Sequence, residues 1–168
     1  ITQQLMKLYT PYTIPEISSN VLLLDADTVF LNPIEFINSE GEPYFTAAGE
    51  YHIPYFEHMK RLLPWLKRET DHSGICHHML MQKCVLDDLF QMIEKQHQTA
   101  PWKAICSCVT DFYGSGLSEY EIYFNFILAR SDQAHIRSLK WENWGSINSL
   151  EDKRAQGYTF SSCHSWFR

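Results

Sequence analysis

The sequence predicts a single α/β domain, and three observations support this fold class. Short apolar runs alternate with longer segments in which apolar residues recur at helical spacing, as in domains that pack helices on a sheet. The 168 residues are enough for one domain with a core, and no repeat, low-complexity tract or linker divides them. The apolar run at 21–25 ends in two acidic residues, at the position where open α/β sheets bind ligands. We therefore expect a mixed sheet flanked by helices over residues 1–168.

Hydrophobic spacing and breaker residues place the elements of the first half of the chain. In order, these are a helix over 3–9 that ends at Pro11, a strand over 21–25, a short apolar strand bounded by Pro33 and the polar 38–42 stretch, a strand over 43–48, and a helix over 55–67 that is interrupted at Pro64. Because the sequence opens within a helix, we expect that the first β-α unit of the domain is missing and that the chain is a fragment.

The second half of the chain alternates helices with strands after a tight element at 73–76. The expected elements are helices over 82–98, 101–109 and 118–130, followed by strands over 136–141 and 158–163. Their apolar positions, such as those of the 82–98 segment, recur at the spacing of one helical face.

Composition and charge exclude several classes of protein. The 45% hydrophobic and 20% charged content is ordinary for a globular domain, and no apolar run approaches the ~20 residues of a membrane span. A net charge of −6 without a basic stripe argues against nucleic acid as a partner. The five cysteines are odd in number and irregular in spacing, so we expect them to be reduced. These properties predict a cytoplasmic protein, with a position at the membrane periphery as the other option.

Asp25, Ala26 and Asp27 form the most informative motif of the chain. Side chains alternate along an extended segment, so both carboxylates are expected on one side, about 7 Å apart, with Ala26 turned away. Paired carboxylates suit Mg²⁺ or Mn²⁺, which keep further positions for water and substrate phosphates. The motif therefore predicts a metal site that serves a nucleotide diphosphate. The alternative is structural, with Asp25 ending a buried strand and Asp27 capping a turn.

Two carboxylates at the start of the helix expected over 118–130 are candidate catalytic residues, Glu119 and Glu121. Ser118 takes the cap position, and Glu121 is expected to reach back to it in a capping box. This structural explanation accounts well for Glu121. It leaves Glu119 free to point into a cleft, as a base or as an acceptor of a sugar hydroxyl.

Three histidines and a lysine have both functional and ordinary interpretations. His164 follows the last expected strand and offers an imidazole ligand that suits Mn²⁺ better than Mg²⁺, or it is a solvated tail residue. His77 and His78 are adjacent, so their side chains diverge and do not readily share one metal; one can be packed and the other exposed. Lys7 precedes the acidic motif on the first helix, where it either meets a diphosphate or is an ordinary exposed lysine.

Five segments in this order resemble GT-A fold glycosyltransferases, and more closely an uncharacterised bacterial and viral family within that superfamily. They are the helix at 3–8, the Asp-x-Asp motif at 25–27, a donor-sugar segment at 73–78, an acidic helix start at 118–123 and a late strand at 163–165 that carries a histidine. Asp-x-Asp alone is nonspecific, whereas five ordered segments over essentially the whole chain are more specific.

The resemblance implies a Rossmann-like GT-A fold and a reaction that moves a sugar from a nucleotide diphosphate sugar to an acceptor hydroxyl, as in glycan or polysaccharide synthesis. It implies that Asp25, Asp27 and His164 hold Mn²⁺ or Mg²⁺. It also implies that Glu119 is the base or contacts the donor sugar. The residues expected to bind the nucleotide sugar are Lys7, Asp25, Ala26, Asp27, Ser73, His77 and His78. Because the first β-α unit of such folds grips the base, the fragment is expected to bind its donor poorly.

Two other functions compete with this interpretation. The motif also matches the nucleophile pattern of haloacid-dehalogenase-type phosphatases, in which Asp25 would attack phosphorus. That chemistry needs a second acidic pair at a strand end, whereas Asp87 and Asp88 lie in a helical pattern. The third function is a carbohydrate-binding module without turnover, and the retained carboxylate pair argues against it.

Overall fold

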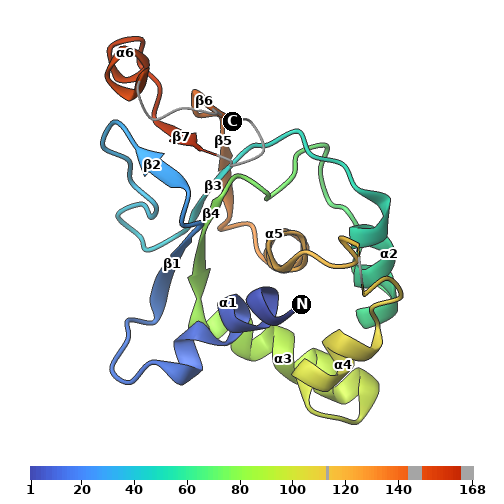
Figure 1. The fold of residues 1–168 in the computed structure, drawn as a ribbon. Helices are drawn as coiled ribbons and strands as arrows, with labels where there is room; N and C mark the ends of the chain where they lie inside the picture. The colour runs from blue at the N-terminus through green and yellow to red at the C-terminus, as the bar shows by residue number, and fades with distance from the viewer. Residues whose placement is uncertain (113, 144–148, 164–168) are drawn as a thin grey trace.

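A computed structural model describes residues 1–112, 114–143 and 149–163, and it shows a mixed α/β architecture. Helices and strands alternate along the chain, which confirms the predicted class (Figure 1). In the described residues the strands form three small hydrogen-bonded sheets and not one continuous sheet. The expectation of a single mixed sheet is therefore met only in part, because short strands and intervening turns interrupt the pairing.

The strand before the acidic motif is β1 (Asn20–Leu24), and it pairs antiparallel with β4 (His78–Gln82). Leu24 lies opposite His78, so the pairing brings the residues after β1 next to the residues before β4. The sequence did not predict β4. Its first four residues are all buried, so it lacks the alternation that marks a half-exposed strand.

Two further sheets lie beyond the acidic motif. In one, β7 (Phe160–Ser162) is central, antiparallel to β2 (Thr28–Phe30) and parallel to β6 (Trp141–Asn143). In the other, β3 (Tyr44–Thr46) is parallel to β5 (His135–Arg137). The prediction of one strand over 136–141 is wrong, because this segment contributes to two strands in different sheets.

The helices predicted from the sequence are present with shifted ends. Their bounds are α1 Thr2–Thr13, α2 Ile53–Leu62, α3 Lys83–His97, α4 Pro101–Ser107 and α5 Glu119–Arg130, and α6 Leu150–Ala155 was not predicted. The helix α1 continues past Pro11, contrary to expectation, because a proline in the last turn costs only one hydrogen bond there. Helix α2 ends at Leu62, two residues before Pro64, as the restriction on residues that precede proline favours.

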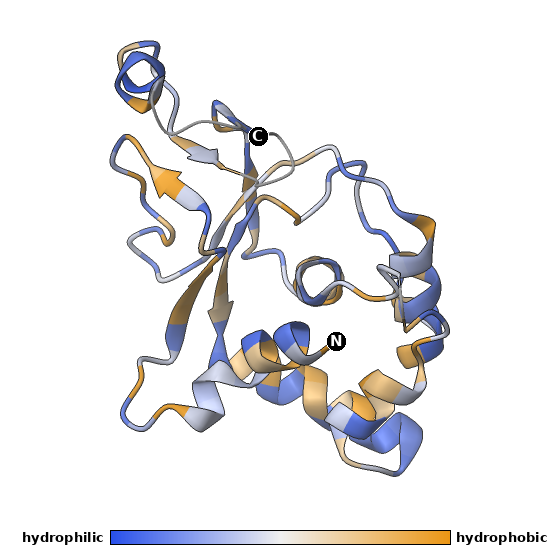
Figure 2. Ribbon diagram, viewed as in Figure 1, coloured by the Kyte–Doolittle hydropathy of each residue, from blue (hydrophilic) through white to orange (hydrophobic). Residues whose placement is uncertain are grey.

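Helix α5 lies at the centre of the molecule, between the strands and the helices α1, α2 and α3 (Figure 1). Every residue from 119 to 127 on it is buried, so it has no solvent face over its first two turns. Helices α2 and α3 carry hydrophobic and hydrophilic residues together, and they bury one face each (Figure 2). This packing buries the acidic start of α5. None of the described helices is long and apolar enough to cross a membrane.

Candidate functional site

A cavity of about 630 Å³ opens beside the carboxyl end of β1. It is lined from several elements, among them Lys7 of α1, Asp25 after β1, His77 before β4, Glu119 and Tyr120 of α5, and Trp141 of β6. These segments are far apart in the sequence and meet only because α1, α5 and the β1–β4 pair pack together. Four of the predicted site residues, Lys7, Asp25, His77 and Glu119, thus line one cavity.

Lys7 is the centre of an ion-pair cluster in this cavity. Its Nζ lies 2.6 Å from Oδ1 of Asp25 and 2.7 Å from Oε1 of Glu119. The ammonium also lies 4.2 Å from the ring centroid of Tyr120, within the range of a cation–π contact. Burial opposes the charge on Lys7, but its two carboxylates outweigh burial and raise its pKa. The interpretation of Lys7 as an ordinary exposed lysine is therefore wrong.

The side chain of Asp25 contacts three polar or charged side chains. Besides Lys7, the hydroxyl of Tyr120 donates to Oδ1 over 3.3 Å, and Nδ1 of His77 lies 3.5 Å from Oδ2. Its backbone N–H donates to the carbonyl of His77 over 2.8 Å. Burial raises the pKa of Asp25, but His77 and Lys7 together bring it below its ordinary value. Asp25 is therefore a carboxylate at neutral pH.

The acidic motif is a turn and not an extended segment. Ala26 and Asp27 form the turn, and the N–H of Thr28 donates to the carbonyl of Asp25 over 3.0 Å. The expected strand-like alternation of Asp25 and Asp27 is therefore wrong, because a turn at Ala26 and Asp27 separates β1 from β2. Ala26 is exposed, and Asp25 and Asp27 are half-buried.

Asp27 is held against the end of β7. The hydroxyl of Ser162 donates to Oδ1 of Asp27 over 3.2 Å, and the N–H of Cys163 donates to the Asp27 carbonyl over 2.7 Å. His164, the predicted third metal ligand, lies outside the described residues. Its prediction stays untested.

The donor set for a metal ion in this region is small. Among the residues that the structure describes, no group of three or more His, Cys, Asp or Glu side chains is arranged to hold a metal. Asp25 and Asp27 alone offer carboxylate oxygens from one turn, and Asp25 is ionised. Carboxylate oxygens are ligands that Mg²⁺ and Mn²⁺ accept beside water and phosphate, and two of them do not make a closed structural site. Of the two, Asp25 lines the cavity and Asp27 does not.

Glu121 lies in a different environment from Glu119. Only 1% of it is exposed, and its carboxylate accepts hydrogen bonds from the hydroxyl of Ser73 and, over 2.9 Å, from Nδ2 of Asn125. Burial raises its pKa, although both hydrogen bonds oppose the shift. The hydroxyl of Ser118 accepts from the N–H of Glu121, so half of the predicted capping box is confirmed. The other half is wrong, because the Glu121 side chain binds Ser73 and Asn125.

Two predicted site residues, Glu121 and Ser73, lie behind the cavity wall. Neither lines the cavity, and Ser73 is fully buried. The structure therefore does not bring them to the cavity surface as a catalytic group and a ligand-binding group. They connect the cavity wall to α5: Ser73 accepts from the N–H of Ile75, and Ile75 lines the cavity.

The two adjacent histidines separate, as the sequence indicated. His77 lines the cavity with a left-handed backbone (φ 68°), and its ring meets Trp141 edge-on with centroids 5.5 Å apart. His78 points into an aromatic core with Phe160, and its Nε2 lies 3.2 Å from the hydroxyl of Thr46. Burial lowers the pKa of His78 to about 4. The prediction that His78 binds the nucleotide sugar therefore has no support, because its ring is enclosed by the core.

Sequence reasoning missed three aromatic residues of the cavity: Tyr55, Tyr120 and Trp141. Trp141 stacks on Phe160 with ring centroids 5.2 Å apart and an interplanar angle of 11°. The high aromatic content was a general signal, but nothing in the local pattern distinguished these residues from core aromatics.

Comparison with known proteins gives no independent assignment. No protein-family model matches the chain, and no curated protein has a similar sequence.

Proposed function

We propose that the chain is a metal-dependent glycosyltransferase that moves a sugar from a nucleotide diphosphate sugar to an acceptor hydroxyl. The observation that carries the proposal is the convergence of Asp25, Lys7 and Glu119 at one cavity wall, with Asp27 two residues further on. Asp25 and Asp27 offer two carboxylates for a divalent metal ion. Lys7 offers a positive charge for a phosphate, and Glu119 offers a buried carboxylate for a hydroxyl group. The GT-A fold and a donor and acceptor of this kind belong to the same proposal.

Asp25 and Asp27 are the residues that would hold Mn²⁺ or Mg²⁺. A divalent cation at this place supplies charge stabilisation to the diphosphate as it leaves. The protein contributes an Asp25 side chain that is already ionised and oriented by Tyr120 and His77. Its orientation precedes ligand binding, so little rearrangement is needed on that side of the site.

Lys7 and Glu119 have complementary roles. The Lys7 ammonium stabilises the Glu119 carboxylate over 2.7 Å and lies where a diphosphate bound at Asp25 would meet it. A carboxylate has about four acceptor positions. After the contact with Lys7, Glu119 therefore keeps capacity to accept a hydroxyl proton or to hold a sugar hydroxyl. Only 4% of Glu119 is exposed, and such a dry setting strengthens both interactions.

The walls of the cavity suit a sugar ring. Tyr55 and Trp141 present apolar surface beside charged groups. Sugars offer both C–H faces and hydroxyl groups, so a cavity lined by aromatic faces and a few placed polar groups fits them.

The phosphatase alternative is weaker than the proposal. Asp87 and Asp88 lie on α3, where Asp87 accepts from Lys83 and Asp88 accepts from Arg130. They do not line the cavity, so they cannot act as the second acidic pair of such a site.

A thermal-shift titration tests the metal assignment. Nucleoside diphosphates are added to the chain with and without Mn²⁺, and a metal-dependent rise in Tm is expected for at least one of them. The Asp27→Asn variant should lose this rise because it removes a ligand and its charge, while Asp132→Asn, at an exposed position after α5, should keep it. An undiminished rise in Asp27→Asn rejects the metal site. Stabilisation by beryllium fluoride with Mg²⁺, but not by any diphosphate, would favour the phosphatase.

A further inference from the structure

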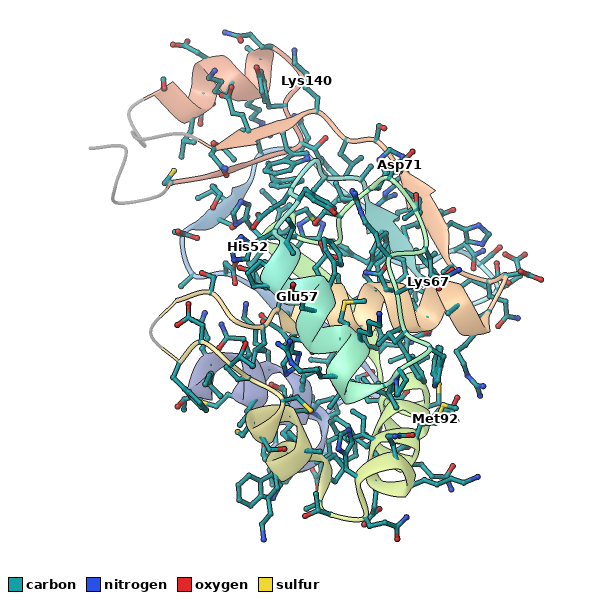
Figure 3. All side chains as sticks on the ribbon, turned by 90° about the vertical axis from the view of Figure 1, so that its right-hand side faces the viewer. His52, Glu57, Lys67, Asp71, Met92 and Lys140 are labelled. Carbon is teal, nitrogen blue, oxygen red and sulfur yellow. The ribbon has the colours of Figure 1, made fainter. Side chains whose placement is uncertain are left out.

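A second hollow, of about 430 Å³, lies along α2 and the residues that follow it. Three large apolar side chains on it are exposed: Tyr51 (61%), Ile53 (57%) and Trp65 (40%). Figure 3 looks onto this side of α2, where Glu57 and Lys67 are labelled. The apolar residues lie together here, so they form a continuous face and not scattered exposed positions.

The net charge of this face is positive, whereas the net charge of the chain is negative. The charged residues that line the hollow are Lys60, Lys67 and Arg68 against Glu57, in a protein with a net charge of −6. The neighbouring acids Glu50, Glu69 and Asp71 are not among the residues that line the hollow. Exposed aromatic residues are therefore combined with a local positive excess.

Arg68 connects the basic and the aromatic parts of the face. Its guanidinium carbon lies 4.8 Å from the ring centroid of Tyr51 and 5.6 Å from that of Phe56. It also donates to the carbonyl of Asp71 over 2.5 Å, so its position is fixed. The positive charge is thus held beside the apolar surface.

A comparable apolar groove on the chain lacks this charge. It lies between α1 and α4, encloses about 610 Å³, and includes the exposed Met6, Ile14 and Trp102. None of the described residues that line it is charged, and the one ammonium that we find beside it is that of Lys103, 5.4 Å from the ring centroid of Trp102. Hydrophobic exposure therefore does not distinguish the two surfaces, whereas the basic residues single out the face on α2.

We propose that the face formed by Tyr51, Ile53, Trp65, Lys60, Lys67 and Arg68 docks on an anionic membrane surface. Tyr and Trp are favoured at the boundary between headgroups and acyl chains, and Ile53 adds apolar area there. Basic residues near the surface are attracted by acidic lipids. The helix α2 also supplies Tyr55 to the cavity, so docking holds the cavity rim near the headgroups.

Co-sedimentation with vesicles of phosphatidylcholine, with and without 30 mol% phosphatidylserine, tests the proposal. The chain should bind the vesicles that contain phosphatidylserine, and binding should weaken as salt rises. The double variant Lys60→Gln/Lys67→Gln should lower the partition coefficient by about 25-fold, at about fivefold for each basic residue. Its matched control, Lys95→Gln/Lys103→Gln, neutralises two exposed lysines outside this face and should change binding much less.

The apolar part is tested separately with Trp65→Ala. Several-fold weaker binding is expected. Trp102→Ala, which removes a tryptophan of similar exposure from the groove between α1 and α4, should bind as the unchanged chain does. Urea unfolding of each variant establishes that it is folded. Three outcomes overturn the proposal: no binding at low salt, equal losses in the variants and their controls, or a concentration-dependent dimer that Trp65→Ala abolishes.

Discussion

Glu119 and Glu121 lie two residues apart in the first turn of α5, and both are nearly fully buried. Glu119 meets the Lys7 ammonium at the wall of the cavity, whereas Glu121 meets the hydroxyl of Ser73 and the amide of Asn125. Positions two apart on a helix differ by about 200° in direction. Two identical side chains therefore belong to different regions, one built around a cation and one around neutral donors.

The difference shows what each region contributes. A buried carboxylate is tolerated only when charge or hydrogen bonds compensate its desolvation. In the cavity, Lys7 provides this compensation and leaves a charged group at a surface that a ligand can reach. At Glu121, neutral donors provide it and join α5 to the 73–75 segment, which carries part of the cavity wall. We infer that Glu119 acts on the ligand and that Glu121 positions the wall.

Truncation of Glu121 is the largest expected effect on stability. The Glu121→Ala variant leaves Ser73 and Asn125 without their acceptor in a buried site and opens a cavity, at a cost of about 3–4 kcal/mol in the free energy of unfolding. Urea unfolding measures it, with Glu94→Ala on an exposed part of α3 as the control. A loss as small as that of the control would mean that Glu121 does not join α5 to the 73–75 segment.

Removal of the charge of Glu119 should affect transfer more than stability. If Glu119 is the base, Glu119→Gln lowers the rate of sugar transfer by about a hundredfold and leaves nucleotide binding nearly unchanged. The matched variant is Glu121→Gln, which should change stability and leave the rate of transfer nearly unchanged. Equal loss of nucleotide binding in both variants would falsify the division between the two regions.

The pH dependence of stability provides the smallest and most specific comparison. Burial raises the pKa of Glu121 above its ordinary 4.5. The folded chain then holds a proton that the unfolded chain releases, so this group destabilises the fold as pH rises through the raised pKa. The pKa of Asp25 is held below its ordinary 3.8 despite burial. Its stabilisation is therefore complete above 3.8 and is lost as pH falls through the lowered pKa.

Urea unfolding at successive pH values separates the two groups. Each group changes the free energy of unfolding by at most about 1.4 kcal/mol per pH unit, over the pH range between its unfolded and its folded pKa. Glu121→Gln should remove the decline above pH 4.5, and Asp25→Asn should remove the acid loss below pH 3.8. If neither variant changes how the free energy of unfolding depends on pH in its range, the environments assigned to Glu121 and Asp25 are wrong.

Local sequence patterns gave much of the secondary structure but less of the site. The helical spacing over 82–98 and the capping serine at 118 were sufficient to place α3 and the start of α5. The strand β4 was not predicted, because a strand buried on both sides shows no alternation of apolar and polar residues. The strands β5 and β6 were predicted as one strand, because the short break between them leaves no clear signal in the sequence. The turn at Asp27 was missed for a related reason, since the apolar residues on both sides suggested one extended segment.

The sequence by itself determined the α/β class, helices α1 to α5 and the placement of an acidic pair after an apolar strand, because these depend on neighbours within a few residues. Only the tertiary structure decided which carboxylates face the cavity and which partners they have. Lys7 meets Asp25 and Glu119 across separations of 18 and 112 residues, and His78 turns into the core while His77 faces the cavity. The physical reason is that the orientation of a helix or strand about its own axis is set by the elements packed against it, and those contacts are long-range.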